Sequence, residues 1–109
     1  MLEELMKILA DKTRLRILNL LFYRPHCVCE LTKILDLPQS TVSRHISKMR
    51  LIGIIMPEKM GTLTKYSIND KIANKFIFFN YLKHDLFNEY SEDIERSKEY
   101  VVLDNNCNL

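Results

Sequence analysis

Four residues at positions 36–39, Asp-Leu-Pro-Gln, separate two short helical segments and constrain the fold more than any other part of the chain. Apolar residues at helical spacing predict one helix from about residue 28 to 35. A second helix is predicted from about residue 40 to 51, with apolar side chains on one face only. Two helices joined by so short a turn are typical of a helix-turn-helix unit.

The second of these helices has an outer face that carries hydrogen-bonding or cationic groups and no acidic residue. We predict that this face binds DNA, because a helix of this kind enters the major groove, where its side chains reach base edges or phosphates. The alternative is a solvated polar face on an ordinary helical domain. The predicted contact residues are Gln39, Ser40, Thr41, Ser43, Arg44, His45 and Lys48.

A basic hairpin is predicted directly after this helix. Gly53 is expected to end the helix, and two strands are predicted at residues 54–56 and 64–68. Lys59 and Lys65 in this hairpin are expected to contact phosphates, which position a protein on DNA without reading its sequence.

The charge is unevenly distributed along the chain. Residues 38–68 contain five Lys or Arg residues and one Glu, whereas residues 72–109 contain four Lys or Arg residues and seven acidic residues. The chain is therefore expected to meet double-stranded DNA with one side only.

Further helices are predicted before and after this unit. A short helix is expected at residues 2–9 and another after Asp11 or Thr13, either of which can cap it. One long helix is expected from about residue 71 to 96, longer than the core of so small a chain requires. The expected fold class is mostly α with a small β-hairpin, a winged helix-turn-helix that dimerises through its first and last helices.

Residues 1–96 are expected to form this single domain, and residues 97–109 a mobile C-terminal tail. The N-terminal residues lack the pattern of a secretory signal, and no apolar stretch approaches the length of a membrane span. The chain is therefore expected in the cytoplasm and away from membranes.

The cysteines are the candidate ligand site. Cys27 and Cys29 lie at the start of the first helix of the helix-turn-helix, and Cys107 lies in the tail. In a reducing compartment such thiols point to metal binding or redox chemistry before structural disulfides. Two positions i and i+2 of a regular helix point about 200° apart, so both thiols face one ion only if the helix starts between them or is distorted.

Four segments of the chain resemble the ArsR/SmtB family of metal-sensing repressors. Residues 9–18 (LADKTRLRIL) resemble its opening signature, and residues 27–31 (CVCEL) resemble its metal box, usually written ELCVCDL. Residues 40–46 (STVSRHI) resemble its recognition helix, and residues 65–68 (KYSI) resemble its wing. The likeness covers about residues 5 to 70 and is nearest to the arsenical-resistance repressors.

This resemblance implies a homodimer that binds operator DNA without ligand and leaves it when As(III) or Sb(III) binds, with Cd, Pb and Zn as further candidate ions. The ligands would be the thiolates of Cys27 and Cys29, since soft centres favour sulfur. Thr32 stands where the best-known arsenite sensors place a third cysteine, so Cys107 is the candidate third ligand, with water, a small thiol or His26 as the alternatives. Ion binding is expected to unwind the start of the helix at residues 28–35 and so to displace the recognition helix that packs on it.

Other functions remain open at this point. A thiol-based redox or persulfide sensor would use the same scaffold and join Cys107 to Cys27 or Cys29. An enzyme with a cysteine nucleophile would need a histidine base and an anion-binding loop, and neither is evident, so no enzymatic activity is expected. A zinc site around His84 on the last helix is not expected, because the second histidine of such a site is missing.

Overall fold

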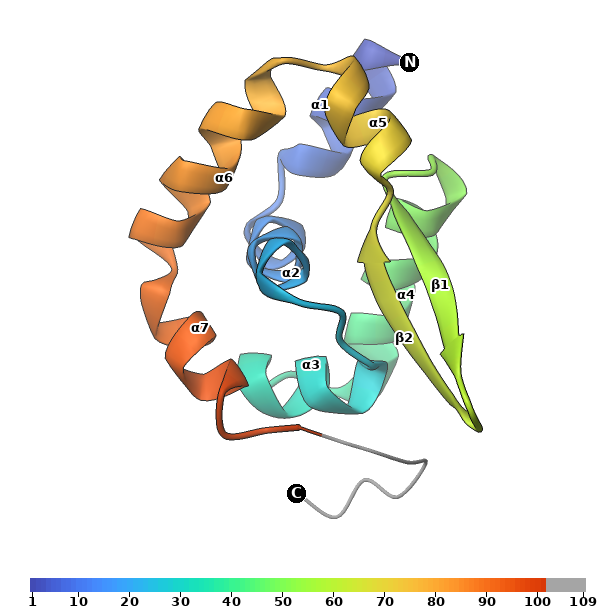
Figure 1. Ribbon diagram of the computed structural model, residues 1–109, viewed down its shortest axis with the longest axis vertical. Coiled ribbons are helices and arrows are strands. Elements are labelled where there is room, and N and C mark those ends of the chain that lie inside the picture. Colours follow the sequence, from blue (N-terminus) through green and yellow to red (C-terminus); the bar gives the residue numbers. More distant parts are fainter. Residues whose placement is uncertain (102–109) are drawn as a thin grey trace.

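The computed structural model describes residues 1–101, in which helices and one hairpin surround a central helix, α2 (Figure 1). On one side of α2 lie the two helices of the helix-turn-helix, α3 and α4, and the hairpin. On the other side α6 and α7 curve around α2 (Figure 1). The expectation of a mostly α fold with a small hairpin is confirmed. In chain order the elements are α1 (Leu2–Leu9), α2 (Lys12–Tyr23), α3 (Val28–Leu35), α4 (Gln39–Leu51), β1 (Ile55–Met60), β2 (Leu63–Ile68), α5 (Asp70–Lys75), α6 (Phe78–Glu89) and α7 (Ser91–Ser97).

Local capping explains where α2 begins and α4 ends. The Asp11 side chain accepts a hydrogen bond from the backbone N–H of Arg14 at 3.0 Å, which satisfies one of the free donors of the first turn. Gly53, just past the end of α4, has φ 85°, and its N–H donates to the carbonyl of Arg50 at 2.9 Å. This left-handed conformation suits glycine and closes the last turn of the helix. Both signals were predicted from the sequence and are confirmed.

The turn between α3 and α4 brings the apolar faces of the two helices together. Asp36 ends α3 in the left-handed conformation (φ 54°, ψ 51°), which Asp tolerates better than most residues, and Pro38 precedes α4. The apolar faces predicted for the two helices are confirmed as core. They comprise Leu31, Ile34 and Leu35 of α3 with Val42, Ile46 and Met49 of α4, each at most 3% exposed.

The hairpin is longer than the sequence predicts. The two strands pair antiparallel from Ile55 opposite Ile68 to Met60 opposite Leu63, and Gly61 at φ 68° makes the turn. Pro57 lies within β1 and is tolerated there because β1 is an edge strand that does not need every backbone donor.

The prediction of one long helix over residues 71–96 is wrong. The segment forms α5, α6 and α7, with breaks after Lys75 and at Tyr90. The breaks let the segment curve around α2 (Figure 1), so that Phe79, Leu86 and Ile94 are all at most 4% exposed. A straight helix would carry its far end away from this core.

Polar side chains of α2 hold the curved segment in place. Asn19 donates from Nδ2 to the carbonyl of Tyr90 at 3.2 Å, at the junction of α6 and α7. Arg16 makes a bidentate contact with Asp93, with Nε and Nη2 each 2.8 Å from a carboxylate oxygen. These contacts come from residues more than seventy positions apart, which explains why local periodicity did not predict the breaks.

Apolar residues that recur along this segment pack onto the chain's own core: Phe79 and Leu86 are buried, and Ile72, Phe76, Leu82 and Tyr90 are partly buried against it. Other apolar side chains are exposed instead: Leu2 and Met6 on α1, Tyr81 and Phe87 on α6, and Ile77 beside α6, each at least 43% exposed. Among the helices of residues 1–101, none is long and apolar enough to cross a lipid bilayer.

Candidate functional site

Most of the α4 residues that were predicted to contact DNA lie at the protein surface. Gln39, Ser40, Arg44 and Lys48 are exposed, and Thr41 and Ser43 are partly exposed. Lys59 is exposed on the hairpin. No acidic residue lies in the α4 sequence, so this face presents donors and cations to solvent, as a groove-binding helix requires.

His45 is turned back toward the protein. Its Nδ1 lies 3.2 Å from Nη1 of Arg14, whose Nε donates to the carbonyl of Ile8 at 2.7 Å. Burial lowers the pKa of His45, and a guanidinium can only donate, so neutral Nδ1 is the acceptor. In this conformation His45 connects α4 to α2 and, through Arg14, to α1. Its contact with DNA stays a prediction.

Lys65 occupies a different place from the exposed one expected for a phosphate contact. It is 8% exposed, and its Nζ lies 3.5 Å from Oε1 of Glu30 on α3. Its ammonium group would have to leave this carboxylate to reach a phosphate. Of the two hairpin lysines predicted to touch DNA, Lys59 is therefore the one that is positioned to do so.

Cys27 is the N-cap of α3. Its Sγ accepts the backbone N–H of Glu30 at 3.4 Å, and the Glu30 side chain accepts the N–H of Cys27 at 2.8 Å. These two reciprocal bonds form a capping box, with a thiol in the place of the usual hydroxyl. The helix begins at Val28, between Cys27 and Cys29. This meets one of the two conditions under which both sulfur atoms can face one ion. Cys29 is disulfide-bonded in this structure, so within residues 1–101 only Cys27 carries a free thiol.

The cysteine pair packs against the hairpin. Cys27 is 3% exposed and clusters with Leu63 of β2, and the partly buried Cys29 packs on the same cluster. Burial raises the pKa of the Cys27 thiol. Although Cys27 lies at a helix N-terminus, desolvation of the charged form outweighs the hydrogen bond from the N–H of Glu30, so the thiolate is not favoured. An ion must therefore displace a proton from this sulfur.

Within residues 1–101 the fold brings no third metal ligand next to Cys27 and Cys29. Cys107 falls outside the described residues. Within residues 1–101, no group of three or more His, Cys, Asp and Glu side chains is placed to hold a metal ion. His26, the neighbour of Cys27, uses both ring nitrogens in protein contacts: Nδ1 with the carbonyl of Arg24 at 2.8 Å and Nε2 with Oγ of Ser97 at 2.7 Å.

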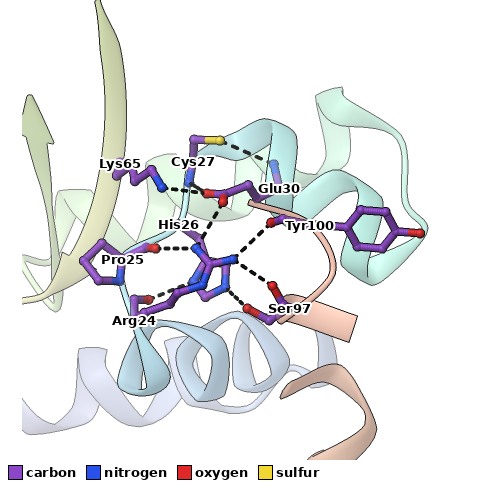
Figure 2. Close-up of polar contacts among 8 residues, drawn as sticks. All are labelled: Arg24, Pro25, His26, Cys27, Glu30, Lys65, Ser97 and Tyr100. Atoms are coloured by element: carbon purple, nitrogen blue, oxygen red, sulfur yellow. Dashed lines mark hydrogen bonds and ion pairs between the residues drawn. The ribbon is translucent and has the colours of Figure 1, made fainter. Parts of the chain in front are cut away.

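A buried carboxylate, Glu30, lies beside Cys27 (Figure 2). Besides the N–H of Cys27, it contacts Lys65 from the hairpin and Nη1 of Arg24 at 3.0 Å. Arg24 also donates from Nη2 to the carbonyls of Ser97 and Tyr100, at 2.9 and 3.0 Å. The start of α3, the hairpin and the segment after α7 therefore meet at one buried charge.

His26 belongs to the same buried polar cluster (Figure 2). The carbonyl of Arg24 only accepts, so Nδ1 carries the proton and Nε2 accepts the Ser97 hydroxyl. Burial and then the charge of Arg24 lower the pKa of His26 to about 4. Its backbone also pairs with Tyr66 of β2, at 3.1 and 2.8 Å. His26 thus connects the start of α3 to the hairpin through its backbone and to α7 through its neutral imidazole.

Sequence reasoning missed this cluster. Ser97 was assigned to the mobile tail, yet it is the last residue of α7 and is fully buried. One signal was available: Glu30 follows Cys27 by three residues, the spacing of a capping box. Arg24 carried no comparable signal, because its partners at positions 97 and 100 lie more than seventy residues away.

A helix-turn-helix followed by a hairpin, on a frame of further helices, defines a winged helix-turn-helix domain. The sequence profile of the family described as "Bacterial regulatory protein, arsR family" matches residues 11–56. The chain is 38% identical over 73 residues to the arsenical resistance operon repressor of Bacillus subtilis, covering 66% of this chain and 70% of that protein. It therefore belongs to the ArsR family of bacterial regulatory proteins, and the resemblance seen in the sequence is confirmed.

Two further comparisons agree. The cadmium resistance transcriptional regulatory protein CadC of Listeria innocua is 37% identical over 70 residues, which are 62% of this chain and 59% of CadC. The chain thus matches only about three fifths of that relative's length. The crystal structure of the transcriptional repressor PagR of Bacillus anthracis superposes with a TM-score of 0.62 at 36% identity, covering 73% of this chain and 90% of PagR.

Proposed function

We propose that this protein is a metalloid- or metal-responsive transcriptional repressor of the cytoplasm. It binds operator DNA as a homodimer and is released when As(III), Sb(III) or another soft ion binds the thiolates of Cys27 and Cys29, completed by Cys107. The observation that carries the proposal is the position of Cys27: the candidate ligand atom is also the cap of the helix that supports α4.

The two uses of the Cys27 sulfur compete. In the free protein Sγ accepts the N–H of Glu30 at 3.4 Å and so stabilises the first turn of α3. A soft ion that takes the sulfur lone pairs removes that acceptor, which loosens the start of α3. The core residues of α3 pack on α4, so a shift of α3 changes the register of the DNA-facing helix. Because the proposed regulator catalyses no reaction, binding the ion and shifting α3 are the only tasks of this site.

The relatives support this class of inducer. The Bacillus subtilis protein is named for arsenical resistance and the Listeria innocua protein for cadmium resistance. Both ions are soft enough to prefer thiolates. Since the two names differ, As(III) and Cd(II) are both tested, with Sb(III), Pb(II) and Zn(II) beside them.

The dimer is proposed to form through α1 and α6. Leu2 and Met6 of α1 and Tyr81 and Phe87 of α6 leave large apolar side chains 43–71% exposed. Exposed apolar patches of this kind mark interaction sites. A symmetric pair would present two α4 helices about one DNA turn apart.

The test is an operator titration under strict reduction, with and without each ion. Wild type should lose operator affinity with at least one ion. Cys27→Ser should keep its affinity and lose the response, because a hydroxyl caps a helix well but does not bind soft ions. Cys27→Ala should lose the response and also about 0.5–2 kcal/mol of unfolding free energy, since it cannot cap.

A second arm separates metal sensing from thiol oxidation. If an oxidant without metal releases the operator, and no ion does so under reduction, the protein is a redox or persulfide sensor. Cys107→Ser should abolish a disulfide switch, whereas the proposed metal response should weaken with the loss of its third ligand but keep the part that Cys27 and Cys29 provide. If neither ions nor oxidants weaken operator binding, the proposed sensing function is wrong.

A further inference from the structure

The buried pair Glu30 and Lys65 joins the start of α3 to the hairpin. Residues 27–30 at this helix start are called the cysteine box below. Glu30 is fully buried, and Lys65 is 8% exposed, with Oε1 and Nζ 3.5 Å apart. The same Oε1 accepts the backbone N–H of Cys27 at 2.8 Å. One carboxylate oxygen therefore contacts both the residue that would bind the ion and a residue of the hairpin (Figure 2).

The hairpin is attached to this region at two further points. Leu63 of β2 packs on Cys27 and Cys29, and Tyr66 exchanges two backbone hydrogen bonds with His26. Leu63, Lys65 and Tyr66 are close neighbours on one strand, so one side of β2 rests on the cysteine box. A change in the box is transmitted to the position of the hairpin through these three contacts.

We propose that Glu30 and Lys65 are positioning residues of the inducer response, which transmit ion binding at Cys27 to the hairpin. The inference rests on the proposed function. When Cys27 turns toward an ion, its N–H leaves Oε1 of Glu30 and the capping box opens. The carboxylate then shifts, Lys65 loses its partner, and β2 is no longer held where the hairpin meets DNA. The hairpin and α4 thus leave their DNA-binding positions together.

This assignment differs from a direct phosphate contact by Lys65, and the two make opposite predictions. A phosphate contact contributes equally to operator binding with and without inducer. A positioning residue changes the ratio of the two affinities, which is the coupling between ion and operator. The ratio of operator Kd with arsenite to operator Kd without it, the release ratio, is therefore the quantity to measure.

The variant is Lys65→Met in the full-length reduced protein, with Lys59→Met as the matched control on the same hairpin. Methionine keeps most of the length and removes the ammonium. Arg24 still pairs with Glu30 in this variant, 3.0 Å away, so the buried carboxylate keeps a cation. Lys59 is exposed, so its replacement removes a hairpin charge without touching the box.

Wild type is expected to show a release ratio of about 5 to 150, the usual range of allosteric coupling. Lys65→Met should lower this ratio at least about fivefold, toward 1. Lys59→Met should weaken operator binding with and without arsenite by the same factor and leave the ratio unchanged. Cadmium replaces arsenite in a parallel series.

Amide hydrogen exchange of wild type gives a readout that needs no variant. Arsenite should speed exchange of the Tyr66 N–H, which is bonded to the carbonyl of His26 at 2.8 Å, and leave the core amides of α2 unchanged. If Lys65→Met fails to fold, the exchange rate of the Tyr66 amide in wild type is the measurement that tests the inference.

Two results overturn the inference alone: a release ratio for Lys65→Met equal to that of wild type, or no change at Tyr66 while arsenite releases wild-type protein from DNA. If no ion releases wild type, the proposed function fails, and the inference fails with it.

Discussion

The polar outer face of α4, which we propose binds DNA, and the segment 27–30 at the start of α3 lie close in sequence but differ in nearly every physical respect. Arg44 and Lys48 are exposed, whereas Cys27 and Glu30 are at most 3% exposed and hydrogen-bond to each other. The first surface is ready to bind a large polyanion without rearrangement. The second is closed, so a ligand must break existing contacts to enter. Under the proposed function this difference predicts tight coupling between them, because a ligand that opens a closed site must move its neighbours.

The largest effect is expected from Glu30→Gln, which tests how much the closed region depends on one charge. The change leaves Lys65 and Arg24 beside a neutral amide in a buried site. Loss of one partner of a buried pair costs about 3–5 kcal/mol, measured as unfolding free energy in urea. Glu95→Gln, which loses only the exposed contact with Lys98, should leave stability unchanged. Equal effects of the two substitutions would show that Glu30 has no special role.

A pH effect of about 3 kcal/mol is expected from His26. Its folded pKa is about 4, below the ordinary 6.5, so the unfolded chain binds a proton that the folded protein does not. The stability it contributes is complete above pH 6.5 and is lost as pH falls toward 4, at 1.36 kcal/mol per pKa unit. Urea unfolding at several pH values should show that His26→Gln has a smaller loss over this range than wild type. Identical slopes would contradict the neutral, buried imidazole.

Substitutions on the exposed face of α4 should affect DNA binding rather than stability. Arg44→Ala should weaken operator binding by about 1–3 kcal/mol, roughly 5- to 150-fold, and leave the unfolding free energy nearly unchanged, because Arg44 is exposed and free to contact DNA. The measurement is a titration at fixed salt, repeated at several salt concentrations. Lys98→Ala, far from α4, is the control and should leave affinity unchanged. A variant that loses stability but not affinity would reverse the contrast between the two regions.

The fold was predictable where the signal is local. The spacing of apolar residues placed α1 to α4, and Asp11 and Gly53 marked helix ends that the structure confirms. Caps and periodicity act within one or two turns of a helix, so a single sequence contains them. The DNA-facing side was predictable for the same reason, except that His45 turns toward Arg14.

The rest depended on contacts between distant residues. The breaks in the 71–96 segment follow from packing on α2, where Arg16 meets Asp93 and Asn19 meets Tyr90. The inward position of Lys65 follows from Glu30, on a different element. The helical period of residues 71–96 is continuous across the breaks, and the hairpin pattern is the same whether Lys65 faces solvent or α3.

The sequence by itself determined α1 to α4, the helix-turn-helix, the family and the cysteines that we propose as ligands of a soft ion. Only the tertiary structure decided that Cys27 caps α3, that Glu30 is buried beneath it, and that Arg24 connects this carboxylate to the carbonyl of Ser97, 73 residues away. The physical reason is range. Helix propensity and capping are set by neighbours in the chain, whereas the burial of a charge is stable only where several elements supply its partners.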